Sequence, residues 1–265
     1  MLERGTVLGG RWIITRTIVT GNTAVVYGAT DAERKDECAV KHVRDDVPAA
    51  SRDLVARKFA DEVRFLATLD HPAIPHVRGF HAEEGNSWMA MDLATGSTLE
   101  SALHAAGGPL PAVEVADAMV ELLDVLEYLH GRTPPLLHRG IKPANLIREP
   151  ISGHLKLVDF GIARVFDVAD DTTKTMVGSL SWCPPEQIQG HPEPRSDLYA
   201  AGATMHHLLV GKAPAALNIK PLKAAAPNVD AGLAAIVDRA TAQKPADRFA
   251  SAAEMRAALI GWLTR

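Results

Sequence analysis

The chain has 265 residues, of which 47% are hydrophobic and 23% charged, so its composition is that of an ordinary globular protein and excludes a disordered, collagenous or coiled-coil chain. Its 28 Lys and Arg against 32 Asp and Glu give a net charge of −4, which offers no electrostatic attraction for nucleic acid or an anionic membrane as the main partner. Cys38 and Cys183 are too few for a disulfide framework, and no apolar stretch reaches the ~18 residues of a membrane span, so we expect a cytoplasmic chain without a membrane segment.

The first ninety or so residues have the pattern of strands around one helix. Runs of β-branched and apolar residues predict strands at residues 12–19, 24–29, 38–43, 74–81 and 87–93. Turn signals at Gly21 and Gly85 join the first two and the last two of these runs into hairpins. Apolar residues recur at helical spacing over residues 53–69, and this helix should end before Pro72, because the residue before a proline disfavours helical dihedrals.

After Gly96 the pattern changes to helices. Helical apolar periodicity covers residues 113–130, 197–210, 231–242 and 250–263. The second of these is apolar nearly all round, which is typical of a helix buried in the middle of a lobe. Residues 136–147 and 155–160 predict short strands with loops.

A chain of this length fits one large domain or two smaller lobes, because single cores stop growing at roughly 250 to 300 residues. The change of pattern favours two lobes. We therefore expect an α+β fold with a small antiparallel sheet and one helix in an N-lobe of about residues 1–91, a hinge at residues 92–96, and a mainly helical C-lobe at residues 97–265.

Lys41 and Glu62 are the first candidates for a functional pair. Glu62 lies between Phe59 and Leu66 on the inward stripe of the first predicted helix, where an unpaired carboxylate would be costly. Lys41, at the end of a buried strand, is the obvious cation. Such a pair at the mouth of a cleft places an ammonium where it can meet a polyphosphate, although a purely structural pair has the same pattern.

Polar motifs follow in a fixed order along the second lobe. They are His138-Arg139-Gly140-Ile141-Lys142-Pro143-Ala144-Asn145, Asp159-Phe160-Gly161, Pro184-Pro185-Glu186, Ser196-Asp197-Leu198-Tyr199 and Lys244-Pro245-x-x-Arg248. Each alone fits an ordinary turn or loop. Together with Lys41 and Glu62 they resemble the serine/threonine protein kinases of eukaryotic type found in bacteria, from about Arg11 to Leu263.

The resemblance implies a transferase that moves the γ-phosphoryl group of ATP to a protein serine or threonine. Lys41 would contact the α and β phosphates and pair with Glu62, while Asn145 and Asp159 would hold Mg²⁺, for which Mn²⁺ can substitute. Lys142 would support the transferred phosphate. These residue types agree with the chemistry, because Mg²⁺ prefers hard oxygen ligands shared with phosphate.

The resemblance also assigns roles outside the phosphate site. The other nucleotide-binding positions would be Val19, Gly21, Val26, Ala39, the gatekeeper Met91, and the hinge residues Asp92 to Ala94, whose backbone would bond adenine. Ser179 occupies the hydroxyl position of the substrate loop, which disfavours tyrosine specificity. Structural roles fall to Glu186 and Arg248, as an ion pair, and to Asp197, which would brace the catalytic loop.

The glycine-rich loop departs from the family pattern. Where the family has Gly-x-Gly-x-x-Gly-x-Val, this chain has Val19-Thr20-Gly21-Asn22-Thr23-Ala24-Val25-Val26, so only the middle glycine is kept. Backbone amides can still approach phosphates there, but with less conformational freedom. Two interpretations fit this altered loop: a reduced affinity for nucleotide, and ordinary variation within the family.

Gly140 is the second departure, because it stands where the family has its catalytic-loop aspartate. Glycine cannot accept the proton of a substrate hydroxyl, and general bases contribute typically ~10² to 10⁴ in rate, so the transferase should be slow or undetectable. Both a disabled form of an active kinase and a natural pseudokinase, acting as a nucleotide-binding scaffold or allosteric regulator, fit this residue. Binding of Mg·ATP is expected to persist in either. A small-molecule phosphotransferase fits less well, because the motifs of Glu186 and Arg248 are present.

Regulation and partners are the remaining expectations. Thr172, Thr173 and Thr175 lie where the family is often phosphorylated, although a polar loop has the same composition. A phosphate on one of them could bond Arg139, and without a base at Gly140 it would be added by another kinase. We expect a protein substrate or a regulated protein partner. A dimer of kinase domains is also compatible with the sequence.

Overall fold

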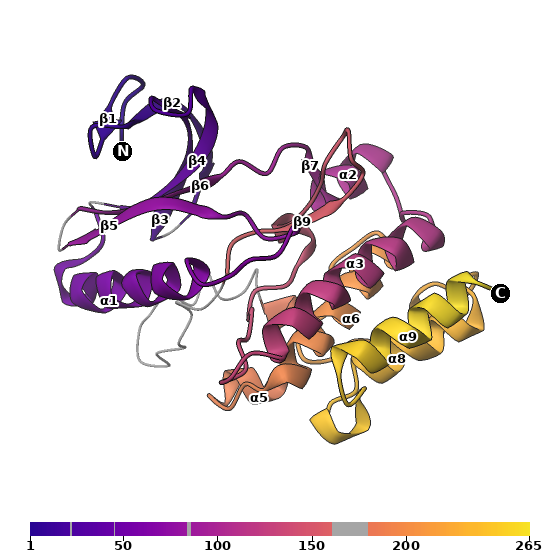
Figure 1. The fold of residues 1–265 in the computed structure, drawn as a ribbon. Coiled ribbons are helices and arrows are strands. Elements are labelled where there is room, and N and C mark those ends of the chain that lie inside the picture. Colours follow the sequence, from indigo (N-terminus) through magenta and orange to yellow (C-terminus); the bar gives the residue numbers. More distant parts are fainter. Residues whose placement is uncertain (22, 45, 84–85, 161–179) are drawn as a thin grey trace. The chain divides into compact units, whose positions relative to one another are not determined.

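The computed structural model describes residues 1–21, 23–44, 46–83, 86–160 and 180–265. These residues form two compact units, Met1–Ala94 and the described residues from Thr95 to the C-terminus. The first unit contains a six-stranded sheet and the second contains most of the helices (Figure 1). The expected α+β class, with an antiparallel sheet first and helices after it, is confirmed.

The sheet of the N-terminal unit is antiparallel throughout, with the strand order β1-β2-β3-β4-β6-β5. Its strands are β1 (Val7–Leu8), β2 (Trp12–Thr20), β3 (Ala24–Asp31), β4 (Asp36–Val43), β5 (Val77–Glu83) and β6 (Asn86–Asp92). The five predicted strands are confirmed as β2 to β6, whereas the two residues of β1 are too few to show a period. Helix α1 (Ala49–Leu66) lies against β4, β5 and β6 (Figure 1) and begins directly after Pro48 rather than at residue 53.

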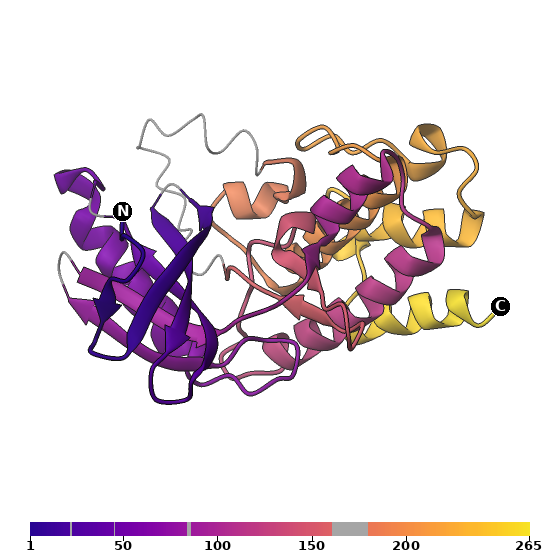
Figure 2. The same ribbon diagram turned by 90° about the horizontal axis from the view of Figure 1, so that it is seen from above.

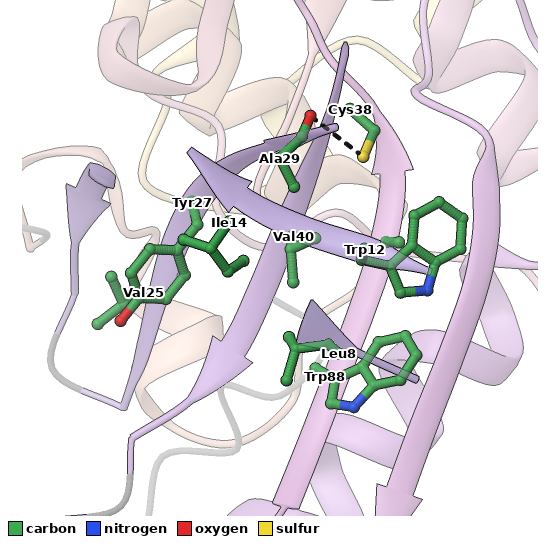
Figure 3. Close-up of a cluster of buried hydrophobic side chains, with 10 residues drawn as sticks. Leu8, Trp12, Ile14, Val25, Tyr27, Ala29, Cys38, Val40 and Trp88 are labelled. Carbon is green, nitrogen blue, oxygen red and sulfur yellow. Dashed lines mark hydrogen bonds between the residues drawn. The ribbon is translucent and has the colours of Figure 1, made fainter. Parts of the chain in front are cut away.

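One face of this sheet carries a cluster of buried side chains. The cluster consists of Leu8, Trp12, Ile14, Val25, Tyr27, Ala29, Cys38, Val40, Trp88 and Ala90 (Figure 3). Its members on β3 and on β4 are every second residue, because successive side chains of a strand point to opposite faces. The residues between them, Val26, Ala39 and Lys41, therefore lie on the other face, and these are residues predicted to meet a nucleotide.

The C-terminal unit is organised around one buried helix. Its described helices are α2 (Leu99–Ala106), α3 (Ala112–His130), α5 (Pro185–Ile188), α6 (Pro194–Val210), α7 (Leu222–Ala225), α8 (Ala231–Ala240) and α9 (Ala252–Leu263). Every residue of α6 from Ser196 to Leu209 is buried, which confirms the prediction of a central helix. Helix α3 packs against α6 and against α9, and Figure 2 shows α9, in yellow, beside α3. No helix in the described part of the chain has the length and apolar character needed to cross a bilayer.

A three-stranded sheet, in the order β7-β8-β9, completes this unit. Its strands are β7 (Ser97–Thr98), β8 (Leu146–Arg148) and β9 (Leu155–Leu157), and short 3₁₀ turns lie at Pro143–Asn145, Leu180–Trp182 and Pro245–Asp247. Gly96 leads into β7 with a φ of 119°, and a Cβ there would lie 2.1 Å from Arg148 O, so this position requires glycine.

The segment of residues 136–147, predicted to hold short strands with loops, is mostly loop. Only its end, from Leu146, belongs to β8. Before it, backbone N–H groups donate to the side chains of Asp197 and His138 instead of to a neighbouring strand. The predicted strand at 155–160 likewise ends at Leu157, because Asp159 has a φ of 57°, which no strand accommodates.

Candidate active site

Lys41 and Glu62 form a buried ion pair in the N-terminal unit. Lys41 lies on β4, with Val26 of β3 and Met89 of β6 as its backbone partners. Glu62 lies on α1, beside the fully buried Val63. Lys41 Nζ is 2.6 Å from Glu62 Oε1, and the two side chains are 13% and 3% exposed. The pair was predicted because a buried carboxylate without a cation would be costly, and Lys41 supplies that cation to Glu62.

Three further predicted nucleotide residues lie on the same face of the sheet as Lys41. Val26 is opposite Lys41 in the β3–β4 register, and Ala39 is opposite Met91 in the β4–β6 register. All three alternate along their strands with members of the buried cluster on the other face. The N-terminal unit therefore presents an apolar wall next to an ammonium, which suits a flat base followed by phosphates.

The turn between β2 and β3 is closed by the glycine that remains in it. Gly21 N donates to Ala24 O at 2.9 Å, and Gly21 O accepts from Arg44 Nη1 at 3.2 Å. A Cβ on Gly21 would lie 2.9 Å from Ala24 O, so glycine is required here by the close approach of the backbone. Val19 precedes this turn, pairs with Val26 and is 55% exposed.

Strand β6 ends at Asp92, the first residue of the predicted hinge. Asp92 N donates to His76 O at 2.9 Å, and the Asp92 carboxylate accepts from Arg78 Nε at 2.7 Å. Met91 before it and Ala94 after it are half-buried. The segment predicted to bond adenine is thus held firmly at its start.

In the C-terminal unit, Asp197 holds the backbone of the loop that contains Gly140. Asp197 lies in the first turn of α6 and is 1% exposed. Its Oδ1 accepts from Arg139 N at 2.9 Å, and its Oδ2 accepts from His138 N at 2.9 Å and lies 3.0 Å from His130 Nε2. Arg139 has a φ of 59°, a conformation that is strained for a residue with a side chain and persists only where its surroundings fix it.

The ionised form of Asp197 is favoured although the residue is buried. Burial by itself raises the pKa of this carboxyl, since an ionised carboxylate loses its hydration. The hydrogen bond and charge of His130, the charge of His138 and the N–H of Arg139 act more strongly in the other direction and hold the pKa below its usual value. The loop therefore keeps a charged acceptor at neutral pH, independently of the residue at position 140.

Gly140 is buried in this loop and bonded through its backbone alone. Its N donates to His138 Nδ1 at 3.2 Å, and its O accepts from Asn145 Nδ2 at 2.8 Å. Gly140 is not among the described glycines with positive φ, so a residue with a side chain can adopt its backbone conformation. Lys142 follows in an extended conformation, directly before the 3₁₀ turn that ends at Asn145.

Asn145 and Asp159 are neighbours because β8 and β9 are antiparallel. Asn145 directly precedes β8, Asp159 follows β9 after one residue, and Val158 N donates to Asn145 O at 3.0 Å. Asp159 is exposed with a φ of 57°, whereas Phe160 is 3% exposed and packs its ring on His138 at a centroid distance of 4.6 Å. The structure thus brings an amide and a carboxylate to one end of this hairpin.

This pair fits Mg²⁺ better than a metal held by protein ligands alone. Within the described ranges no group of three or more His, Cys, Asp and Glu residues is arranged to hold a metal ion. Asn145 Nδ2 donates to Gly140 O, which leaves the Asn145 amide oxygen as a metal-type donor, and Asp159 supplies a carboxylate. One amide and one carboxylate, completed by water and phosphate oxygens, is the kind of set that Mg²⁺ accepts.

Glu186 and Arg248 form the predicted structural pair. Arg248 Nη1 and Nη2 donate to the two oxygens of Glu186 at 2.7 and 3.0 Å, and the Arg248 side chain is fully buried. Ser196 Oγ donates to Glu186 at 2.6 Å, and the Arg248 guanidinium also lies over the ring of Tyr199. Burial raises the pKa of Glu186, but the bonds from Arg248 and Ser196 outweigh it and lower that pKa. The remaining N–H groups of Arg248 donate to three backbone carbonyls, so this pair secures the local fold.

Other predicted residues lie outside the part of the chain that the structure describes. They are the phosphorylation candidates Thr172, Thr173 and Thr175, the substrate-loop residue Ser179, and Gly161 of the Asp-Phe-Gly motif. The roles assigned to them stay predictions.

His130 is a site residue that the sequence analysis missed. It is the last residue of α3 and reaches Asp197 on α6. The only signal in the sequence was its place at the C-terminal end of a predicted helix, where the last turn often carries a basic residue. That signal names no partner, however, and only the packing of α3 against α6 supplies one.

Comparison with known proteins places these features in a family. The family model described as "Protein kinase domain" matches residues 12–260. The chain belongs to the serine/threonine protein kinase family. Kinase PknA of Nostoc sp. is 31% identical over 270 residues, covering 95% of this chain and 47% of that protein, and kinase PrkC of Bacillus subtilis is 31% identical, covering 94% and 40%. The chain therefore spans less than half of the length of these two kinases.

Solved kinase structures agree with this assignment. The kinase domain of PknI from Mycobacterium tuberculosis superposes with a TM-score of 0.81 at 28% identity, covering all of both chains. A second structure, the apo form of PpkA-294, gives a TM-score of 0.80 at 26% identity. The resemblance drawn from the motifs is thus confirmed at the level of the family and the fold.

Proposed function

We propose that this kinase domain binds Mg·ATP but transfers phosphate to protein serine or threonine slowly or not at all. Lys41 would contact the α and β phosphates, Asn145 and Asp159 would hold Mg²⁺, and Lys142 would support the transferred phosphate. The family generally uses ATP with Mg²⁺ and acts on proteins.

The observation that carries the nucleotide part is the buried Lys41–Glu62 pair, with its 2.6 Å bond. A lysine is a flexible point charge, and this carboxylate holds its ammonium on the face of the sheet that also presents Val26, Ala39 and Met91. None of these residues depends on the side chain at position 140. Nucleotide binding is therefore expected to survive the change at Gly140.

Gly140 carries the second part of the proposal. Its position after His138-Arg139 is that of the family's catalytic aspartate, and no side chain there can accept a proton or aim a hydroxyl at the γ-phosphate. A missing general base costs about 10² to 10⁴ in rate, or roughly 3 to 5 kcal/mol of barrier. Kinases usually turn over at ~1 to 100 s⁻¹. Without the base, the turnover rate of a kinase at the fast end of this range would be at most about one per second, and that of a slower kinase would be far lower.

A second function is favoured by the turn that contains Gly21. With a single glycine, this turn has less freedom to fold over phosphates than a glycine-rich loop has. A domain that has lost both the base and the glycines suits a nucleotide-binding scaffold or an allosteric regulator of another protein. The first function predicts that one aspartate restores catalysis, and the second predicts that it does not.

Phosphorylation in trans is part of either function. Among the described residues, Arg139 Nε is buried without a hydrogen-bond partner, although the Arg139 backbone is bonded to Asp197. A phosphate on Thr172, Thr173 or Thr175 would supply charged acceptors for this guanidinium. Because Gly140 removes the base, the phosphate would come from another kinase.

The test compares three chains: the unaltered one, Gly140→Asp and the matched control Gly140→Asn. Thermal shifts with ATP, with and without Mg²⁺, measure binding, since stabilisation grows as RT ln(1 + [L]/Kd) and all three should respond at millimolar ATP. Transfer of labelled phosphate to the chain itself or to a generic basic protein measures catalysis. Gly140→Asp should transfer about 10² to 10⁴ times faster than Gly140→Asn, because the two side chains are nearly isosteric and only one is a base.

The outcomes separate the two functions. If Gly140→Asp binds Mg·ATP but transfers no phosphate, the scaffold function is the correct one. If none of the three chains shifts with ATP, the nucleotide has no place in the function of this domain.

A further inference from the structure

Three aspartates from different strands meet at one end of the N-terminal sheet. In an antiparallel sheet the end of one strand lies beside the start of the next, so Asp31, which ends β3, is opposite Asp36, which begins β4. Asp92 ends β6 and lies opposite Cys38, which is two residues after Asp36 on β4. Three carboxylates this close would repel each other without a cation among them.

Arg78, near the start of β5, supplies that cation. Its Nη1 is 2.7 Å from Asp36 Oδ1 and 3.7 Å from Asp31 Oδ2, and its Nε is 2.7 Å from Asp92 Oδ1. The Arg78 side chain is 9% exposed and that of Asp31 is fully buried. Arg11 closes the network with two bonds to Asp31, of 2.7 and 2.8 Å. The planar fork of an arginine is suited to holding several carboxylates at once.

The charge states of the network agree with this geometry. Burial lowers the pKa of Arg78, but its hydrogen bonds to Asp36 and Asp92 and their charges outweigh burial and raise that pKa. The hydrogen bond from Arg11 holds the pKa of Asp31 well below its usual range. Arg78 and Asp31 are therefore both charged at neutral pH.

The network reaches the hinge through Asp92. Both oxygens of its carboxylate are engaged, Oδ1 by Arg78 Nε at 2.7 Å and Oδ2 by His76 N at 3.3 Å, while Asp92 N donates to His76 O. We infer that Arg78 is a positioning residue for the adenine end of the nucleotide site, acting through Asp92. This inference rests on the proposed function, because it takes the backbone of Asp92 to Ala94 as the adenine-binding segment.

The inference predicts which part of the nucleotide is affected. Arg78 acts on the hinge, whereas Lys41 lies on β4 and is bonded to Glu62. Loss of Arg78 should therefore lower the affinity for adenosine and the affinity for ATP by the same factor. Loss of Lys41 should weaken ATP and leave adenosine unchanged.

The experiment measures the dissociation constants of adenosine and of Mg·ATP by calorimetry, for the unaltered chain and for Arg78→Met, Asp92→Ala, the double variant and Lys41→Met. Arg16→Met is the matched control, because Arg16 makes a two-bond pair with Glu37 on the same sheet but is half exposed. Arg78→Met and Asp92→Ala should each raise the dissociation constants of both ligands about tenfold, because each variant loses a charge-assisted bond. The double variant should be no weaker than either single one, because both remove the same link. Arg16→Met should bind as the unaltered chain does.

A purely structural role of Arg78 gives a different pattern. It would lower the melting temperature but leave the dissociation constants, measured well below the transition, within twofold of the unaltered chain, and this result overturns the inference. If Arg78→Met does not fold, Asp92→Ala carries the test, since the Asp92 side chain is 37% exposed. A failure of the unaltered chain to bind either ligand overturns the proposed function and the inference together, whereas normal binding by both variants overturns the inference alone.

Discussion

Replacing Asp197 by asparagine tests how the loop around Gly140 is held. Both carboxylate oxygens of Asp197 are used by backbone donors, Oδ1 by Arg139 N and Oδ2 by His138 N, and Oδ2 also faces His130. Asparagine supplies one acceptor and one NH₂ group. In either orientation of the amide, a buried backbone N–H faces another donor.

The size of the effect follows from this count. A buried donor without an acceptor costs about 1 to 3 kcal/mol, and the remaining bond loses its charge assistance, so Asp197→Asn should lower the free energy of unfolding by about 3 kcal/mol. Asp230→Asn is the matched control. Asp230 accepts from Gly232 N, Leu233 N and Trp262 Nε1 with Oδ1 alone, so an amide oxygen can replace it, and asparagine caps helices as well as aspartate does.

Urea unfolding followed by tryptophan fluorescence measures the free energies, and amide hydrogen exchange at His138 and Arg139 measures the loop. Asp197→Asn should lose stability and exchange protection at both amides, while Asp230→Asn should lose neither. Equal losses in the two variants would refute the claim that the use of both oxygens makes Asp197 irreplaceable.

Two further predictions concern the C-terminal unit. Arg248→Met should lower the free energy of unfolding by about 3 to 5 kcal/mol, because it leaves the Glu186 carboxylate half-buried without its cation; a loss below about 1 kcal/mol in urea unfolding would contradict this. Burial lowers the pKa of His206 and of His207 below the usual 6.5, so the unfolded chain takes up protons before the folded one does, and stability should fall as the pH drops below about 6.5 and level off below the lowered values. Urea unfolding between pH 7.5 and 5 should show this slope and should show it reduced in the double variant His206→Gln/His207→Gln; an unchanged slope would argue against the two histidines as its source.

Much of the candidate site could be predicted from the sequence, because it depends on residue types and on motif spacing, which are local features of the chain. Glu62 on a buried helical stripe predicted a nearby cation, and the structure pairs it with Lys41. The family resemblance implied that Asn145 and Asp159 act together, and they lie at one end of the β8–β9 hairpin. By contrast, the sequence did not show where the short strand in residues 136–147 begins, because backbone donors before Leu146 are satisfied by a side chain from α6, which no local pattern reveals.

The amino-acid sequence by itself determined the order of the longer strands and helices, the family and the absence of a carboxylate at position 140, because periodicity, turn residues and motif spacing act between near neighbours in the chain. Only the tertiary structure decided which charges meet. Arg78 and Asp36 are 42 residues apart, and Asp197 is 58 residues from Arg139. Contacts of this kind depend on strand register and helix packing, which are set by the burial of the whole core and leave no signature in either residue's own surroundings.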